Sequence, residues 1–118
     1  MKNVIVEKSF EFAVEIVKMA TSLKNNKLYY EIASQLLKSG TSIGANIAEA
    51  QYSQSNKDFA SKMHIALKEA NETQYWLRLL KATEAVEENK AKLLLNDVEE
   101  IKRILTAILK TIHQKQQS

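Results

Sequence analysis

Apolar residues return every three or four positions along most of the chain, which is the spacing that places them on one face of an α-helix. Phe59, Met63, Ala66 and Ala70 illustrate the alternation of four and three. The pattern predicts four helices, at about 7–23, 27–52, 56–82 and 90–112. We expect the first seven residues and the tail from about His113 to be loosely held.

The connections between these segments are short, so the pattern predicts a single all-α domain over residues 1–118, folded as an antiparallel up-down four-helix bundle. One long coiled coil is the alternative, but the polar breaks between the segments disfavour it. A helix of about 26 residues spans roughly 39 Å, which makes the expected bundle an elongated rod.

Local signals refine two of the helices. Ser55, followed three residues later by Asp58, resembles a capping box at the start of the third helix. Gly40 and Gly44 lie one turn apart inside the second helix, where each costs about 0.5–1 kcal/mol relative to alanine. Either a neighbouring backbone or bulky side chain packs closely there, or the helix is kinked or interrupted.

Composition narrows the class of protein. The absence of proline and the presence of only two glycines agree with long helices and few turns. The absence of cysteine excludes disulfides, a thiol nucleophile and thiolate metal ligands. No segment is apolar enough for a signal peptide or a membrane span, so we expect a cytoplasmic protein with no membrane partner.

Catalytic motifs are absent from the sequence. It has no nucleotide-binding glycine motif and no metal-binding pair of glutamate and histidine. His64 lies near Lys57 and Lys68 in sequence, a poor setting for a metal, and is interpreted as a surface residue. We expect no enzyme activity, no cofactor and no metal.

Charge permits a polyanionic partner without requiring one, because the net charge is +3. Acids gather in residues 84–100 and are missing from residue 101 onward, which also suits the dipole of the last helix. Candidate contacts to RNA or DNA are Lys57, Lys62, Lys68, Arg78, Lys81, Lys102, Arg103 and Lys110. A solvated face, with lysines balancing acids, explains the same residues. Lys102, Arg103 and Lys110 are the best candidates because no acid follows residue 100.

A polar stripe interrupts the second helix. Ser42, Asn46 and Glu49 follow the four-three spacing between apolar faces. Polar groups in a helix seam can set register and oligomeric state when they are hydrogen-bonded. We interpret this stripe as structural, with contact to a ligand as the alternative.

The first three segments have apolar residues on two adjacent faces, more than one bundle interior needs. In the first segment Phe10, Val14 and Val17 run beside a second seam that contains Phe12 and Ile16. The surplus predicts a homo-oligomer.

Residues 42–49, Ser-Ile-Gly-Ala-Asn-Ile-Ala-Glu, resemble the signature S-[IV]-P-x-N-I-A-E-G of the four-helix bundle proteins encoded in 23S rRNA intervening sequences. The likeness extends over about residues 8–112, including 55–59, 65–73 and Trp76-Leu77. Gly44 and Ala50 depart from the signature's proline and glycine, which bears on the local bend. The resemblance implies the fold and a homo-pentameric ring. A similar branch, the accessory proteins of diversity-generating retroelements, binds nucleic acid and a reverse transcriptase.

These observations favour a non-catalytic oligomeric scaffold or adaptor that binds RNA or DNA through basic surfaces without sequence specificity. The alternative is a pure protein-interaction module, such as a reverse-transcriptase accessory or an antitoxin-like partner, with no affinity for nucleic acid.

Overall fold

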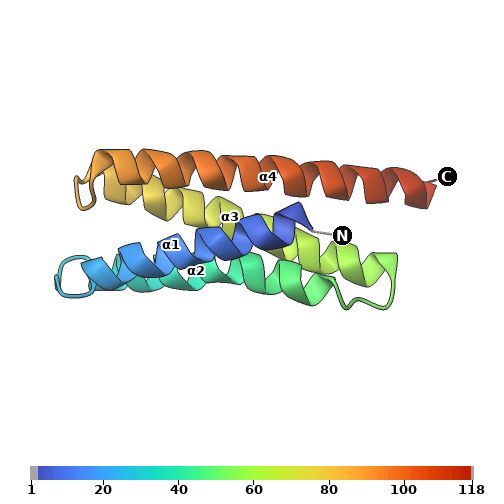
Figure 1. Cartoon of the computed structure of the whole chain (residues 1–118), viewed down its shortest axis with the longest axis horizontal. Helices are drawn as coiled ribbons and strands as arrows, with labels where there is room; N and C mark the ends of the chain where they lie inside the picture. The colour runs from blue at the N-terminus through green and yellow to red at the C-terminus, as the bar shows by residue number, and fades with distance from the viewer. Residues whose placement is uncertain (1–2, 118) are drawn as a thin grey trace.

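The structure is a computed structural model that describes residues 3–117, without the side chains of residues 116 and 117. Four helices form an all-α bundle, as the apolar spacing predicts, and residues 3–117 contain no strand. The molecule is a rod of 51 × 24 × 21 Å (Figure 1). The helices are α1 (Val4–Leu23), α2 (Tyr30–Ala50), α3 (Asn56–Ala82) and α4 (Glu88–Gln117).

The first and last helices extend further toward the chain ends than the apolar spacing predicts. The first helix begins at Val4, and Ile5 is only 3% exposed because it packs into the core. The last helix continues through His113 to Gln117. The expectation of a loosely held N-terminus is therefore wrong for Ile5, which is buried. For the tail from His113 it stays a prediction, and for residues 1, 2 and 118 it lies outside the described residues.

The connection between α3 and α4 is closed by backbone hydrogen bonds. The N–H groups of Ala85 and Glu84 donate to the carbonyls of Leu80 and Lys81, and Glu84 adopts a left-handed φ of 59°. This is the Schellman arrangement that ends many helices, usually with glycine in the left-handed position. At the start of α3, Ser55 Oγ accepts from the Asp58 N–H at 3.0 Å, which confirms Ser55 as the N-cap.

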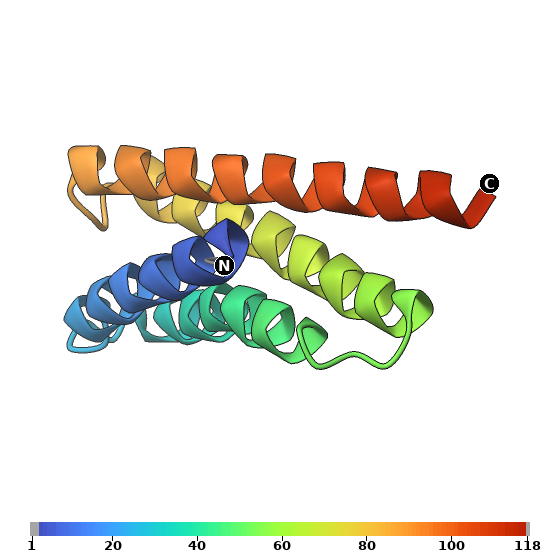
Figure 2. The same cartoon turned by 45° about the vertical axis from the view of Figure 1, so that its right-hand side comes forward.

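The helices pack in the order α1, α2, α3, α4 around the bundle, and the contact between α1 and α4 is the weakest. The α1–α2 and α3–α4 connections lie at one end of the rod, and the α2–α3 connection lies at the other (Figure 1). Figures 1 and 2 both show α1 separating from α4 toward the C-terminal end of α1. Helices α2 and α3 make the most extensive contact in the bundle.

The glycines of α2 allow close packing against α1. A Cβ on Gly40 would lie 2.6 Å from Ile16 Cγ2, and a Cβ on Gly44 would lie 3.2 Å from the Ser9 carbonyl oxygen. Helix α2 runs uninterrupted through both positions. Close packing is therefore confirmed as the reason that glycine stands there, with Ile16 and the α1 backbone as the neighbours.

Candidate nucleic-acid-binding and assembly surfaces

The basic side chains predicted to contact nucleic acid lie on α3 and α4, and two of them have carboxylate partners within the chain. Lys62 donates to Glu49 of α2 at 3.2 Å. Lys102 lies 3.7 Å from Glu99 and donates to Gln74 Oε1 at 2.7 Å, with its side chain 22% exposed. The expectation that no carboxylate competes for Lys102 is therefore wrong, because Glu99 lies one turn before it on the same side of α4.

The other six candidates make no ion pair within residues 3–117: Lys57, Lys68, Arg78, Lys81, Arg103 and Lys110. Lys81 is half-buried beside α4, and the remaining five are exposed. Helical spacing places Lys57, Lys68 and Arg78 on the outward side of α3, and Arg103 and Lys110 on the outward side of α4. The candidates thus form two groups of unpaired cations on adjacent helices.

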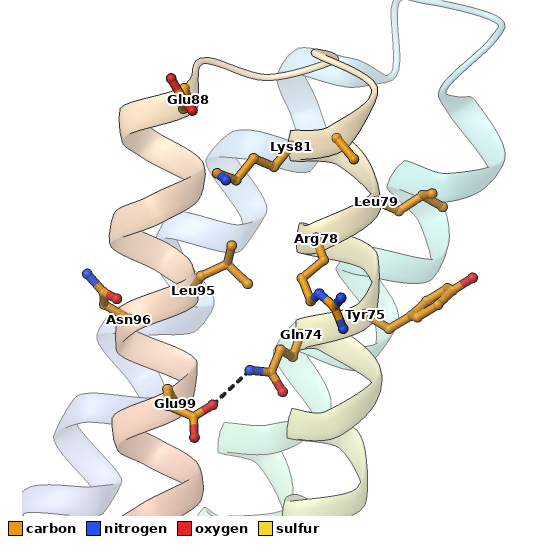
Figure 3. Close-up of a pocket in the computed structure, with 10 residues that line it drawn as sticks. Gln74, Tyr75, Arg78, Leu79, Lys81, Glu88, Leu95, Asn96 and Glu99 are labelled. Carbon is orange, nitrogen blue, oxygen red and sulfur yellow. Dashed lines mark hydrogen bonds between the residues drawn. The ribbon is translucent and has the colours of Figure 1, made fainter.

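A pocket of about 720 Å³ lies between the C-terminal half of α3 and the N-terminal half of α4 (Figure 3). Arg78 and Lys81 come from α3, while Glu88 and Glu99 come from α4. Gln74 Nε2 donates to Glu99 Oε2 at 2.7 Å and ties the two walls together. Because the walls carry both signs of charge, a phosphate group there would meet carboxylates as well as cations.

A second pocket, of about 630 Å³, lies where α1 and α4 separate. Met19, Val86 and Leu94 give it an apolar lining. Its charged lining residues have both signs and include Glu15 and Lys90. This mixture of lining side chains does not indicate a particular class of ligand.

The polar stripe of α2 makes local contacts within one chain. Asn46 Nδ2 donates to the Ser42 carbonyl at 2.8 Å, and Ser42 Oγ donates to the Lys38 carbonyl at 2.6 Å. Glu49 is exposed and pairs with Lys62 of α3. Ser42 and Asn46 are half-buried, and within residues 3–117 their side chains donate hydrogen bonds only to carbonyls of α2 itself. A structural role for Asn46 through contacts between copies of the chain stays a prediction.

The surplus apolar seam of α1 lies on the surface. Phe10, Val14 and Val17 are 68%, 38% and 43% exposed. The neighbouring outer side of α2 is also uncharged, because helical spacing gathers small and apolar residues beside the glycines that contact α1. These α2 residues are Leu37, Thr41, Ala45 and Ala48. We call this two-helix surface the uncharged face.

Candidate chemistry beyond these surfaces is sparse. Among the described residues, no three or more histidine, aspartate or glutamate side chains gather where they could hold a metal ion. His64 is exposed on α3. No helix in the described part of the chain is both long and apolar enough to cross a membrane.

Comparisons with known proteins agree with the fold and the signature of α2. The chain matches no curated protein in sequence. It is similar to the crystal structure of a protein of unknown function from the S23 ribosomal protein family of Bacteroides thetaiotaomicron. The two are 48% identical over 90% of this chain and 98% of that chain, with a TM-score of 0.86. The family described as 23S rRNA-intervening sequence protein matches residues 1–107. The chain belongs to the 23S rRNA-intervening sequence protein family.

Proposed function

We propose that this protein is a non-catalytic scaffold or adaptor that assembles from identical copies, each folded as an up-down bundle, and binds RNA or DNA without sequence specificity. The uncharged face carries the assembly part of the proposal. Exposed apolar side chains in adjacent turns of one helix, bordered by an uncharged side of a second helix, form a surface that water solvates poorly.

A second copy of the chain is the occupant that this face favours. The face has no charge to match, so it suits a partner surface that is also apolar. Every other copy of the chain presents the same apolar surface, so a matching partner is always present. A ring further requires contact between two different surfaces of neighbouring copies. Ile65, which is 40% exposed on α3, is a candidate for part of that second surface. Five copies are favoured by the family resemblance.

Light scattering of the purified protein tests the assembly. We expect a single oligomeric mass for the wild type, and a lower mass when Val14 and Val17 are both changed to lysine. The matched control is Val4→Lys, since Val4 is 66% exposed and helical spacing places it beside the charged residues Glu7, Lys8 and Glu11. A monomeric wild type at micromolar concentration and above would reject the proposal. So would a double variant that keeps the wild-type mass.

Nucleic-acid binding is the second part of the proposal. It is supported by the six candidate cations that have no ion pair within residues 3–117. Five copies at +3 each would carry about +15, and a ring would repeat each basic group, so weak phosphate contacts could add through multivalency. Fluorescence anisotropy over a salt series should show binding that falls steeply with salt.

The alternative function is a protein-interaction module without affinity for nucleic acid, such as an adaptor for a reverse transcriptase or an antitoxin-like partner. The exposed apolar residues favour it equally, because they suit any protein partner. Absence of binding to both RNA and DNA near 50 mM salt would place this alternative first. Both versions assume a cytoplasmic protein, which cell fractionation tests.

A further inference from the structure

The outward side of α3 carries a continuous line of polar and basic side chains. Steps of four and three connect them from the first turn of the helix to the last but one: Lys57, Ser61, His64, Lys68, Asn71, Tyr75 and Arg78. All seven are exposed, and none is acidic. The line extends roughly 31 Å along the helix axis. We call it the α3 ridge.

No neighbouring carboxylate among the described residues forms an ion pair with the cations of the ridge. Among the acids of α3 itself, Asp58 and Glu69 lie by helical spacing on the flank toward α2, whereas the exposed Glu72 borders the ridge one turn after Lys68 and makes no ion pair with it. Glu49 pairs with Lys62 on that flank, while Glu99 is engaged with Gln74 and Lys102 on the opposite one. Lys57, Lys68 and Arg78 make no ion pair within residues 3–117. Their charge is therefore available to an external anion.

The spacing of the ridge suits a linear polyanion. Polar side chains follow one another every three or four residues, which is about 4.5–6 Å along the axis. Ser61, Asn71 and Tyr75 supply neutral hydrogen-bond donors between the cations. Arginine, lysine and these neutral donors are the side chains that commonly contact phosphate and sugar.

Tyr75 adds a feature that phosphate binding alone does not need. Its side chain is 57% exposed, and although Tyr75 borders the pocket between α3 and α4, its ring points away from α4 (Figure 3). The indole of Trp76 contacts the ring edge-on, with 5.1 Å between centroids and an interplanar angle of 76°. This contact restrains the ring and leaves it accessible on the ridge. An exposed aromatic ring in a line of cations is the arrangement on which unpaired bases stack.

We propose that the α3 ridge binds the backbone of single-stranded RNA or DNA, and that Tyr75 stacks on one of its bases. The inference rests on the nucleic-acid part of the proposed function and specifies its site and ligand. A duplex is disfavoured because its bases offer Tyr75 no free face. In addition, α2 and α4 flank α3 and keep the helix from entering a groove.

Fluorescence anisotropy with labelled, mixed-sequence single strands and a duplex of the same length tests the proposal. In the ridge variant, Lys57, Lys68 and Arg78 are all changed to glutamate. Its control reverses the same number of charges elsewhere, at Lys18, Lys27 and Lys90, which are exposed residues outside α3. Light scattering must show the wild-type mass for both variants.

We expect the ridge variant to lose at least about tenfold in affinity, and the slope of log affinity against log salt to fall by roughly two, for three lost contacts to a single strand. The control variant should retain most of the affinity. Tyr75→Ala should weaken single-strand binding about 5- to 150-fold without changing the salt slope, and Tyr75→Phe should restore it.

The outcomes separate the two proposals. Absence of wild-type binding near 50 mM salt rejects both the nucleic-acid function and the ridge. If the wild type binds but only an Arg103→Glu/Lys110→Glu variant loses affinity, the function stands and the ridge is wrong. Equal affinity for the duplex and the single strand would overturn the inference. So would displacement of the strand by polyglutamate at equal charge, combined with no effect of Tyr75→Ala, because the surface would then bind acidic proteins or polyanions in general.

Discussion

The hydroxyls of Thr73 on α3 and Ser39 on α2 share a hydrogen bond of 2.9 Å, and both residues are completely buried. Thr73 Oγ1 also lies 2.8 Å from the Glu69 carbonyl oxygen, whereas Ser39 Oγ is 3.4 Å from its nearest backbone acceptor, the Leu36 carbonyl. The two hydroxyls are therefore unequal. Thr73 has a good partner within its own helix, and Ser39 depends on Thr73.

This asymmetry predicts the cost of removing each hydroxyl. Thr73→Val leaves Ser39 poorly satisfied and should destabilise the protein by about 1–3 kcal/mol. Ser39→Ala should cost about 0.5–1.5 kcal/mol, because Thr73 keeps the Glu69 carbonyl. Urea unfolding at one fixed protein concentration measures both, and the double variant should lose less than the sum. Strict additivity would show that the two hydroxyls do not interact.

Gly40→Ala should destabilise the protein although alanine is the better helix former. The added Cβ would lie 2.6 Å from Ile16 Cγ2, and overpacking of this kind costs about 1–3 kcal/mol. In an Ile16→Ala background the same substitution should become neutral or stabilising. The Cγ2 and Cγ1 atoms at 2.6 and 3.0 Å are then removed, only the Cβ contact at 3.2 Å remains, and alanine is favoured over glycine by roughly 1 kcal/mol. Thermal or urea unfolding of the four proteins measures the sign change. A stabilising Gly40→Ala in the wild-type background contradicts the close packing.

The N-terminal turn of α1 should contribute to stability. Ile5→Ala is expected to cost about 2 kcal/mol or more, because Ile5 packs into the core. The adjacent, exposed Val4 provides the control, and Val4→Ala should stay within about 0.5 kcal/mol of the wild type. Equal effects of the two substitutions would mean that this turn is not packed.

Glu84→Gly should stabilise the connection between α3 and α4. The φ of 59° at Glu84 places its Cβ near a carbonyl oxygen, at a cost of about 1 kcal/mol that glycine does not incur. Glu84→Ala keeps the Cβ and removes the rest of the exposed side chain together with its charge, so it should change the unfolding midpoint little. If alanine and glycine raise the midpoint equally, charge is the cause.

Asn46→Leu should alter oligomeric mass more than unfolding stability. Asn46 bonds to a carbonyl of its own helix, so the monomer loses little, whereas a half-exposed leucine enlarges the apolar surface available to other copies. Asn96→Leu, at an exposed position of α4, is the control for added apolarity. Unchanged assembly with loss of binding to an identified ligand would assign Asn46 to ligand contact instead.

Features that depend on nearby residues could be predicted from the sequence. The four helices follow from apolar spacing, and the N-cap at Ser55 follows from a side chain and a backbone N–H three residues apart. The pair of Lys102 and Glu99 is equally local, and an i,i+3 argument would have found it. The spacing of the α3 ridge is equally local, but its members Asn71 and Tyr75 carry no charge, so the basic residues predicted as contacts did not include them.

The sequence by itself determined the helical segments and most of their core-facing residues, because helix geometry relates positions three and four apart without reference to the rest of the chain. The tertiary structure decided the partners across helices. It brought Ser39 to Thr73, 34 residues away, and Lys62 to Glu49, 13 residues away. It also buried Ile5 and left Lys57, Lys68 and Arg78 without ion pairs among the described residues. These outcomes depend on distances between separate helices, which the packing of their side chains sets and periodicity along one helix does not contain.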